Sequence, residues 1–179
     1  MNFCIRKAQI SDVGAVSDIY ALIHTAEEQG RMTIGWKRGV YPTRAVAEAA
    51  VNRGDLFVME CGGHIVAAAI INQVQVDVYA SAPWQFNAPD NQIMVLHTLV
   101  VDPRAAGHGF GSAFAAFYER YALEHNCPYL RIDTNARNTA ARRLYARLGY
   151  REIAIIPCVF NGLNDVNLVL LEKRADVQP

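Results

Sequence analysis

The stretch from Val100 to Ser112 constrains this chain more than any other, because an apolar run ends there and a helical pattern begins. Pro103 and Arg104 close the apolar run, and three alternating glycines at 107, 109 and 111 precede the helical pattern. The start of a helix leaves about four backbone N–H groups unpaired and carries a partial positive charge. Glycine has no Cβ atom, so an anion can approach those groups closely. The stretch therefore predicts a strand that leads into an anion-binding helix start.

This stretch can be compared with three known phosphate-binding patterns. A nucleoside triphosphate loop requires a lysine after its last glycine, and no lysine lies near residues 107–112. A dinucleotide fingerprint needs a third glycine where Ser112 stands, and hairpins nearby do not suit that fold. The third pattern, Arg/Gln-x-x-Gly-x-Gly/Ala between a strand and a helix, is matched by Arg104, Gly107 and Gly109. A helix start whose glycines serve only packing is the alternative interpretation.

Hydrophobic periodicity predicts a mixed α/β chain in the order β-α-α-β-β-β-α-β-α-β-β. The expected strands are 3–7, 55–60, 65–76, 92–101, 129–134, 150–160 and 166–173, and the expected helices are 11–28, 43–53, 110–126 and 138–148. Hairpins lie early and late, which differs from the strict alternation of a doubly wound fold. Residues 1–179 are expected to form one domain, with 174–179 as a flexible tail.

Composition excludes several classes of partner. The chain is 52% hydrophobic with a formal net charge of zero, so bulk electrostatic capture of nucleic acid or a membrane is not expected. No apolar run approaches the roughly 18 residues of a membrane span, and no signal-peptide pattern begins the chain. The four cysteines are far apart, which predicts neither a metal site nor a disulfide framework. We therefore expect a cytoplasmic protein.

A second pattern follows the glycine stretch. It reads Asn-x-x-Ala-x-x-Leu-Tyr-x-x-x-Gly-Tyr and consists of Asn138, Ala141, Leu144, Tyr145, Gly149 and Tyr150. With both motifs at this separation, the chain resembles the GNAT superfamily of N-acetyltransferases over about residues 3–173 in element order. The resemblance implies a GNAT-like α/β domain, with a central mixed, mostly antiparallel twisted sheet of about 6–7 strands flanked by about 4 helices.

The resemblance implies that the glycine loop binds the pyrophosphate of acetyl-CoA (coenzyme A) through backbone amides. The implied cofactor-binding residues are Leu99, Val100, Val101, Arg104, Ala105, Ala106, Gly107, His108, Gly109, Phe110, Gly111, Ser112, Asn138 and Tyr145. This chain departs from the family at Ala105 and Ala106, where glycine and a basic residue are usual, and at His108, where an aliphatic residue is usual. These changes remove no backbone N–H group. One of the arginines at 137, 142, 143 and 147 could meet the 3′-phosphate.

The resemblance also implies an enzyme that transfers an acetyl group to a primary amine by direct attack in a ternary complex. Tyr145 is the implied proton donor to the departing thiolate, because a phenol with a pKa of about 10 is protonated at neutral pH. Asp133 and His97 are candidates for the general base, and each could instead be structural. Glu27 or Glu28 at the end of the first helix, or water, are the other candidates.

The acceptor is expected to be a small-molecule amine, an amino acid, or a peptide or protein amine. Glu28, Trp36, Tyr41 and Trp84 are the candidate acceptor-binding residues, and the three aromatic ones either wall the acceptor site or fill the core. No metal is implied, and a homodimer is common in the family. The competing function is a non-catalytic acyl-CoA-binding module that kept the loop without the chemistry.

Overall fold

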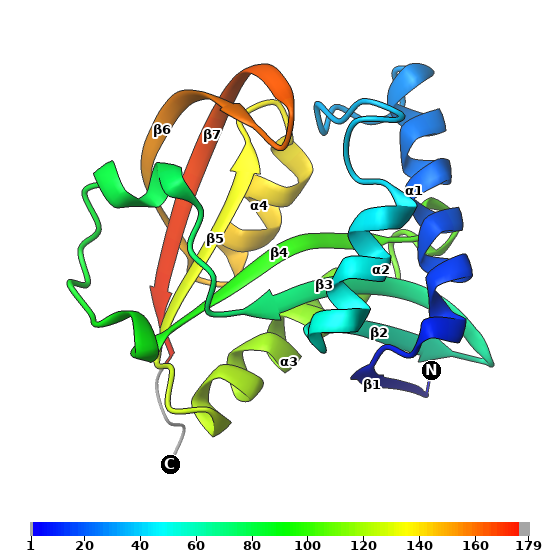
Figure 1. Ribbon diagram of the computed structural model, residues 1–179, viewed down its shortest axis with the longest axis horizontal. Helices are drawn as coiled ribbons and strands as arrows, with labels where there is room; N and C mark the ends of the chain where they lie inside the picture. Colours follow the sequence, from blue (N-terminus) through cyan, green and yellow to red (C-terminus); the bar gives the residue numbers. More distant parts are fainter. Residues whose placement is uncertain (1, 176–179) are drawn as a thin grey trace.

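The computed structural model describes residues 2–175 and contains a seven-stranded sheet in the order β1-β2-β3-β4-β5-β7-β6 (Figure 1). The strands are β1 (Phe3–Lys7), β2 (Leu56–Cys61), β3 (His64–Asn72), β4 (Ile93–Val101), β5 (Tyr129–Asn135), β6 (Arg151–Phe160) and β7 (Leu163–Arg174). Neighbouring strands are antiparallel except β4 and β5, which are parallel. The predicted mixed, mostly antiparallel sheet is confirmed.

Four α-helices flank the sheet, two on each face. They are α1 (Val13–Glu28), α2 (Arg44–Arg53), α3 (Phe110–Glu124) and α4 (Thr139–Arg147). Alternation along β2 sorts the faces, because successive side chains of a strand point in opposite directions. Leu56 and Val58 pack in one core with α1 and α2, whereas Phe57 and Met59 pack in the other with α3. The helices at the two ends of the sequence therefore cover opposite faces of the sheet (Figure 1).

The segment between β3 and β4 forms a third core with the C-terminal strands. It contains two short 3₁₀ turns, η2 (Asp77–Ser81) and η3 (Asp90–Gln92), and Tyr79 from η2 packs on Val95 and Leu168. The sequence predicted that β3 would run to residue 76, but the strand ends at Asn72. The Asn72 side chain accepts the N–H of Val74 at 2.9 Å, a local turn that replaces the strand ladder.

Strands β4 and β5 separate partway along their length. Their pairing runs only from Ile93 with Tyr129 to Leu96 with Ile132, whereas β4 stays paired with β3 as far as Val101. The β3–β4 register shifts near Thr98, a β-branched residue with a φ of +51°. Beyond Leu96, the β5-facing side of β4 pairs with no strand residue within 2–175. The bulge therefore separates β4 from β5 in the middle of the sheet, and we call this β4–β5 boundary the seam.

The C-terminal end of the described chain is better ordered than the sequence predicted. Arg174 is the last residue of β7, and the buried Ala175 donates its N–H to the Pro128 carbonyl at 2.8 Å. The expected flexible tail from residue 174 is thus wrong for these two residues, and 176–179 lie outside the described part. No helix within residues 2–175 is long and apolar enough to cross a membrane.

Candidate active site

The glycine loop between β4 and α3 presents a row of free backbone donors. Gly107 and Gly109 have φ angles of +82° and +77°, conformations that glycine adopts readily. Across residues 2–175, the N–H groups from Gly107 to Ser112 donate to no protein acceptor, and the helix ladder starts when Ala113 donates to the Gly109 carbonyl. These donors converge on one side of a helix start, which is suited to an anion with several oxygens.

We call the free N–H groups from Gly107 to Ser112 the cradle. It contains fewer backbone donors than the sequence predicted. The N–H of Arg104 donates to the Asp102 carboxylate at 2.8 Å, and that of Ala105 donates to the Asp102 carbonyl at 2.8 Å. The N–H of Ala106 reaches the Pro103 carbonyl at 3.4 Å. The turn η4 (Pro103–Ala105) therefore uses the donors of these three residues itself. This is a correction to their expected role as backbone donors to the cofactor.

Two side chains of the loop point away from the ligand side. Arg104 is exposed and forms an ion pair with Asp102 at 2.7 Å. The exposed His108 ring lies over Phe110 with centroids 5.8 Å apart, and its Nδ1 lies 3.1 Å from the Ala106 carbonyl. Neither side chain lines the adjoining cavity. The His108 side chain is therefore solvent-exposed and does not face the cavity.

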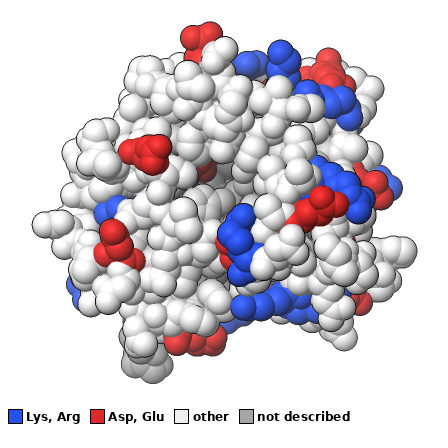
Figure 2. Space-filling view, viewed as in Figure 1, with Lys and Arg blue, Asp and Glu red and all other residues white. Residues whose placement is uncertain are grey.

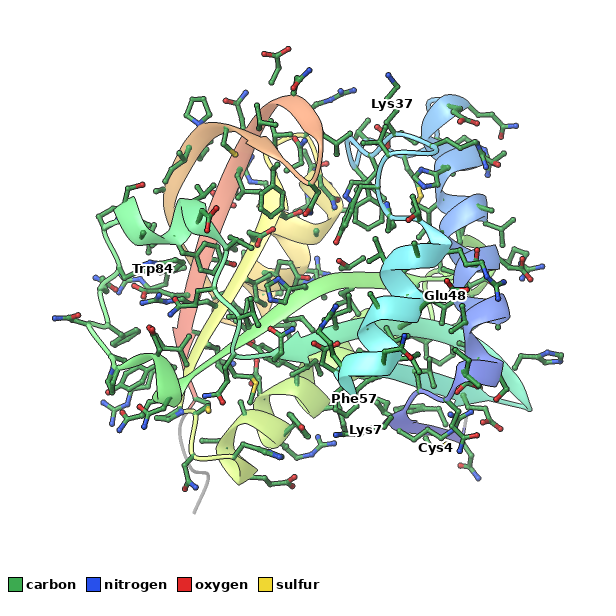
Figure 3. The ribbon with its side chains drawn as sticks, viewed as in Figure 1. Cys4, Lys7, Lys37, Glu48, Phe57 and Trp84 are labelled. Atoms are coloured by element: carbon green, nitrogen blue, oxygen red, sulfur yellow. The ribbon has the colours of Figure 1, made fainter. Side chains whose placement is uncertain are left out.

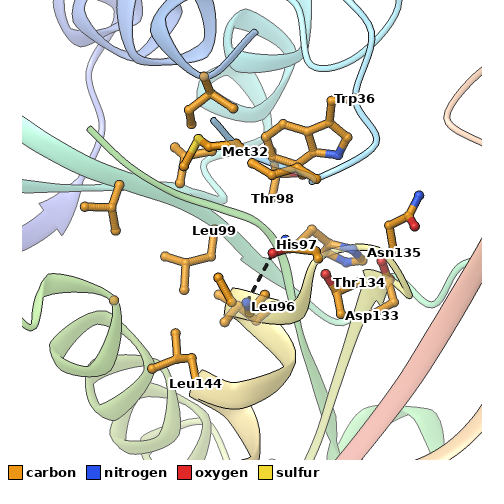
Figure 4. Close-up of a pocket in the computed structure, with 18 of the residues that line it drawn as sticks. Met32, Trp36, Leu96, His97, Thr98, Leu99, Asp133, Thr134, Asn135 and Leu144 are labelled. Carbon is orange, nitrogen blue, oxygen red and sulfur yellow. Dashed lines mark hydrogen bonds between the residues drawn. The ribbon is translucent and has the colours of Figure 1, made fainter. Parts of the chain in front are cut away.

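A cavity of about 1110 Å³ extends from this loop along β4 to the far side of the opened sheet. Figure 4 shows residues of β4, β5, α4 and the α1–α2 loop around it. The cofactor-side residues predicted from the sequence that line it are Leu99, Val100, Val101, Ala105, Ala106, Gly107, Gly109, Phe110, Gly111, Ser112, Asn138 and Tyr145. The candidates for chemistry or acceptor binding that line it are His97, Asp133, Trp36 and Tyr41.

Glu28 and Trp84 do not line the cavity. Glu28 is exposed and pairs with Arg38 at 2.8 Å. Trp84 donates its ring N–H to the Tyr79 carbonyl at 2.8 Å, and the guanidinium of Arg131 lies 3.8 Å from its ring centroid. Trp84 belongs to the third core and lies well away from the loop that carries Lys37 (Figure 3). Both residues are therefore corrections to the expected acceptor-binding set.

The α1–α2 loop forms the opposite wall of the cavity. Its anchor is Glu27, whose carboxylate accepts the N–H groups of Ile34 and Gly35 at 2.6 and 2.9 Å. Gly35 has a φ of +83°, and a Cβ atom there would lie 2.4 Å from Asn135 Nδ2, so a larger residue would strain the loop and displace the Asn135 side chain. Glu27 thus has a structural role, because its carboxylate holds the loop. At the β4 bulge, Tyr41 is hydrogen-bonded to the Thr98 hydroxyl.

Asp133 on β5 is a half-buried carboxyl that faces the cavity. Its desolvation raises its pKa to about 6, and a hydrogen bond from Tyr79 opposes that rise. The Tyr79 hydroxyl donates to Asp133 Oδ2 at 2.8 Å. No sequence pattern indicates a role for Tyr79, because it lies in an irregular segment outside both motifs. Only the packing of that segment across β5 and β7 brings it to Asp133.

His97 on β4 is held by two oxygens. Its Nε2 lies 3.1 Å from both the Val74 carbonyl and the Asn72 side-chain oxygen. A carbonyl oxygen can only accept, so the proton belongs on Nε2 and leaves the Nδ1 lone pair free. Burial lowers the pKa of His97 to about 4, and the ring is neutral at pH 7.

Tyr145 and Asn138 on the α4 side complete the cavity. Tyr145 is buried against Tyr150, with ring centroids 5.7 Å apart. Burial, and then the nearby charge of Asp133, raise the pKa of Tyr145 well above its ordinary value. Asn138 accepts the N–H of Ala141 at 3.1 Å, which makes it a helix cap that also lines the cavity.

The remaining candidates for ligand binding are the arginines near α4 and any group of side chains that could bind a metal. Among the four candidate arginines near α4, Arg147 lines the cavity and Arg142 pairs with Glu152 at 2.7 Å. No group of three or more His, Cys, Asp or Glu side chains that could hold a metal ion occurs in the described part of the chain.

Solved structures share this fold at low sequence identity. A GNAT-family acetyltransferase from Streptococcus agalactiae gives a TM-score of 0.78 at 19% identity, with 98% of this chain and 96% of that one covered. The yncA protein of Salmonella typhimurium, solved with its cofactor acetyl-CoA, gives 0.69 at 20% identity, with 100% and 97% covered. These similarities establish the fold.

Sequence comparison adds the family. A curated relative, an uncharacterised N-acetyltransferase of Methanocaldococcus jannaschii, is 31% identical over 77 residues, which are 42% of this chain. The matched region spans 49% of that relative, about half its length. The model of the acetyltransferase (GNAT) family matches residues 18–150. Because this match covers well over half of the chain and the fold agrees, the protein belongs to the acetyltransferase (GNAT) family.

Proposed function

We propose that this protein is an acetyl-CoA-dependent N-acetyltransferase that acetylates a primary amine by direct attack in a ternary complex. One observation carries the proposal. The free N–H row from Gly107 to Ser112 opens into the same cavity as Asp133 and Tyr145. An anion site, a proton acceptor and a proton donor therefore share one enclosed space, which is what acyl transfer to an amine requires.

The residues present fit acetyl-CoA. The N–H groups of the loop suit its pyrophosphate, and the free edge of β4 at Leu99–Val101 suits the amide-containing pantetheine arm. Asn138, the N-cap of α4, and Tyr145 on α4 line the same cavity as β4, and Arg147 suits a phosphate. Bound there, the cofactor supplies an activated acetyl thioester. The side chains of Arg104 and His108 and the backbone N–H groups of Arg104, Ala105 and Ala106 are left out of the set that donates to the phosphates.

Asp133 is the proposed general base, and Tyr145 the proposed proton donor. The acceptor nitrogen gives up a proton to Asp133 as its bond to the acetyl carbon forms, and the proton then passes to water. Tyr145 would donate its proton to the thiolate that acetyl-CoA releases when its thioester is cleaved, and the Tyr145 phenolate would then recover a proton from water. The raised pKa of Tyr145 keeps that proton in place at neutral pH.

The same reasoning ranks His97 below Asp133. A general base works best when its pKa lies near the working pH. The pKa of Asp133 is about 6, whereas that of His97 is about 4, so the carboxylate binds a proton more readily at pH 7. His97 keeps a free Nδ1 lone pair and contributes as a neutral hydrogen-bond acceptor for the amine.

Thiol release and thermal unfolding test the proposal together. Acetyl-CoA should raise the unfolding temperature, and an amine panel should release free thiol. The Tyr145→Phe variant should keep the thermal stabilisation while thiol release falls by about 10²-fold or more. Stabilisation without thiol release from any amine or peptide, unchanged in Tyr145→Phe, would favour the non-catalytic binding module.

A matched pair of glycine variants tests the cradle. Gly109→Val places a β-branched side chain at a φ of +77° in the loop, where it both strains the backbone and covers the donors. Gly63→Val creates the same strain at a φ of +78° in the β2–β3 turn, and neither Cβ would meet a protein atom within 4 Å. We expect Gly109→Val to lose stabilisation by acetyl-CoA and Gly63→Val to keep it. Equal responses would contradict the cradle.

A further inference from the structure

We propose that the acceptor is a primary monoamine on an apolar body, with one positive charge and no carboxylate. The inference rests on the proposed acetyltransferase function and narrows its substrate class. It comes from the charges and side chains that line the part of the cavity beyond β4, where the α1–α2 loop faces β5 and β7.

Apolar side chains form much of the wall of this part. Met32, Ile34 and Trp36 enter from the α1–α2 loop, and Phe160 and Leu163 enter from the β6–β7 hairpin. Figure 4 shows Met32 and Trp36 facing the strand residues across the cavity, and Figure 2 shows a hollow whose surroundings are largely uncharged. Such walls gain free energy by covering hydrocarbon or aromatic surface.

Only one negatively charged side chain in the described lining of the cavity is available to an acceptor. Asp133 is the only acidic residue among the described residues that line the cavity. One ammonium can therefore be paired at the reacting end. A second ammonium on the same molecule would lie against apolar walls without a partner, and a desolvated unpaired charge is strongly unfavourable. Polyamines and other multiply charged amines are excluded on this ground.

The three arginines that line the cavity are paired, exposed or on α4. Arg53 forms an ion pair with Asp55 at 2.9 Å. Arg31 is exposed and directs two guanidinium nitrogens at the Gln29 side-chain oxygen, at 2.9 and 2.6 Å. Arg147 lies on α4, on the cofactor side. An amino acid carboxylate next to the reacting amine would lie near the Asp133 carboxylate, and the two like charges would repel each other.

Two matched pairs of amines test the inference in the thiol-release assay with the full chain. L-phenylalanine adds a carboxylate to 2-phenylethylamine, and 1,4-diaminobutane adds a second ammonium to n-butylamine. We expect kcat/KM to fall by at least about tenfold within each pair, because the added carboxylate lies near Asp133 and the added ammonium enters the cavity unpaired. Trp36→Ala should raise the KM for 2-phenylethylamine by about tenfold and leave the KM for acetyl-CoA unchanged. Val159→Ala, at an exposed site on β6 outside the cavity, should leave both values unchanged.

A binding measurement supplements turnover. The chain has two tryptophans, of which Trp36 lines the cavity and Trp84 is in the core. Adding 2-phenylethylamine should change tryptophan emission in the wild type but not in Trp36→Phe, which should keep its KM within about threefold because phenylalanine retains an aromatic ring. Equal or better turnover of phenylalanine, diaminobutane or a peptide would overturn this inference and leave the proposed function intact. Absence of thiol release with every amine and peptide would overturn both.

Discussion

Replacing Asp133 by asparagine should make the protein more stable and less active. The carboxyl of Asp133 is desolvated beside the cavity, so its charged form is unfavourable in the folded state. Asparagine is nearly isosteric, and its oxygen can still accept the hydrogen bond from Tyr79. It cannot take a proton from the acceptor amine. We expect kcat/KM to fall by about 10²- to 10⁴-fold.

The stability gain follows from the pKa of Asp133. Folding raises that pKa from 3.8 to about 6, which corresponds to roughly 3 kcal/mol of unfolding free energy once the group is ionised. The side chain is only half-buried, so solvent reduces the figure, and we expect a gain of about 1 to 3 kcal/mol at pH 7.5. Well below pH 3.8 the carboxyl is neutral in both states and contributes no difference. As the pH rises from 4 to 6, the folded protein keeps the proton longer, so wild-type stability falls relative to Asp133→Asn.

Urea unfolding at pH 4, 5, 6 and 7.5 measures this directly. The difference in unfolding free energy between Asp133→Asn and the wild type should grow from pH 4 to 6 and then level off. Asp18→Asn, on the exposed face of α1, should track the wild type at every pH. A destabilised Asp133→Asn at pH 7.5, or a difference that does not change with pH, would refute the desolvation argument. Wild-type kcat/KM in the variant would refute the proposed base.

Two further variants test the hydrogen bond to Asp133 and the position of the α1–α2 loop. Tyr79→Phe removes the hydrogen bond that lowers the pKa of Asp133, so the acid limb of kcat/KM should move to higher pH while activity at pH 9 changes little; an unmoved limb would separate Tyr79 from the base. Gly35→Ala places a Cβ atom 2.4 Å from the Asn135 side chain and should raise the amine KM by displacing the loop. Gly39→Ala, in the same loop with nothing within 4 Å, should not, and equal KM values would show that the loop tolerates the contact.

The element order was predictable because its signals are local. The helix stripes and the apolar strands repeat within a few residues, and both motifs lie in regular elements. The end of β3 was missed because a single side chain, Asn72, forms the turn that stops it. The end of β7 was missed because Ala175 is fixed by a hydrogen bond to the distant Pro128.

The candidate site was predictable only where it follows the motifs. The glycine loop, Asn138 and Tyr145 all line one cavity, as expected from their register. The three donors of η4 could not be excluded from sequence, because their internal partners depend on a local turn. For Trp84, an aromatic residue in an irregular segment, the sequence left open whether it walls the acceptor site or fills the core. Its packing on Tyr79 arises from contacts across the sheet that no short pattern records.

The divergence of β4 from β5 affects where the protein begins to unfold. Direct strand pairing between the N-terminal part of the sheet, β1 to β4, and the C-terminal part, β5 to β7, is limited to four residues of each strand. Fewer paired amides at this seam make it the place where the sheet should open first. A ligand that lies along β4 and contacts α4 bridges the two parts, so its binding energy adds to their cohesion. Slowed hydrogen exchange on both sides of the seam should therefore accompany cofactor binding, although the cofactor touches only a small part of either.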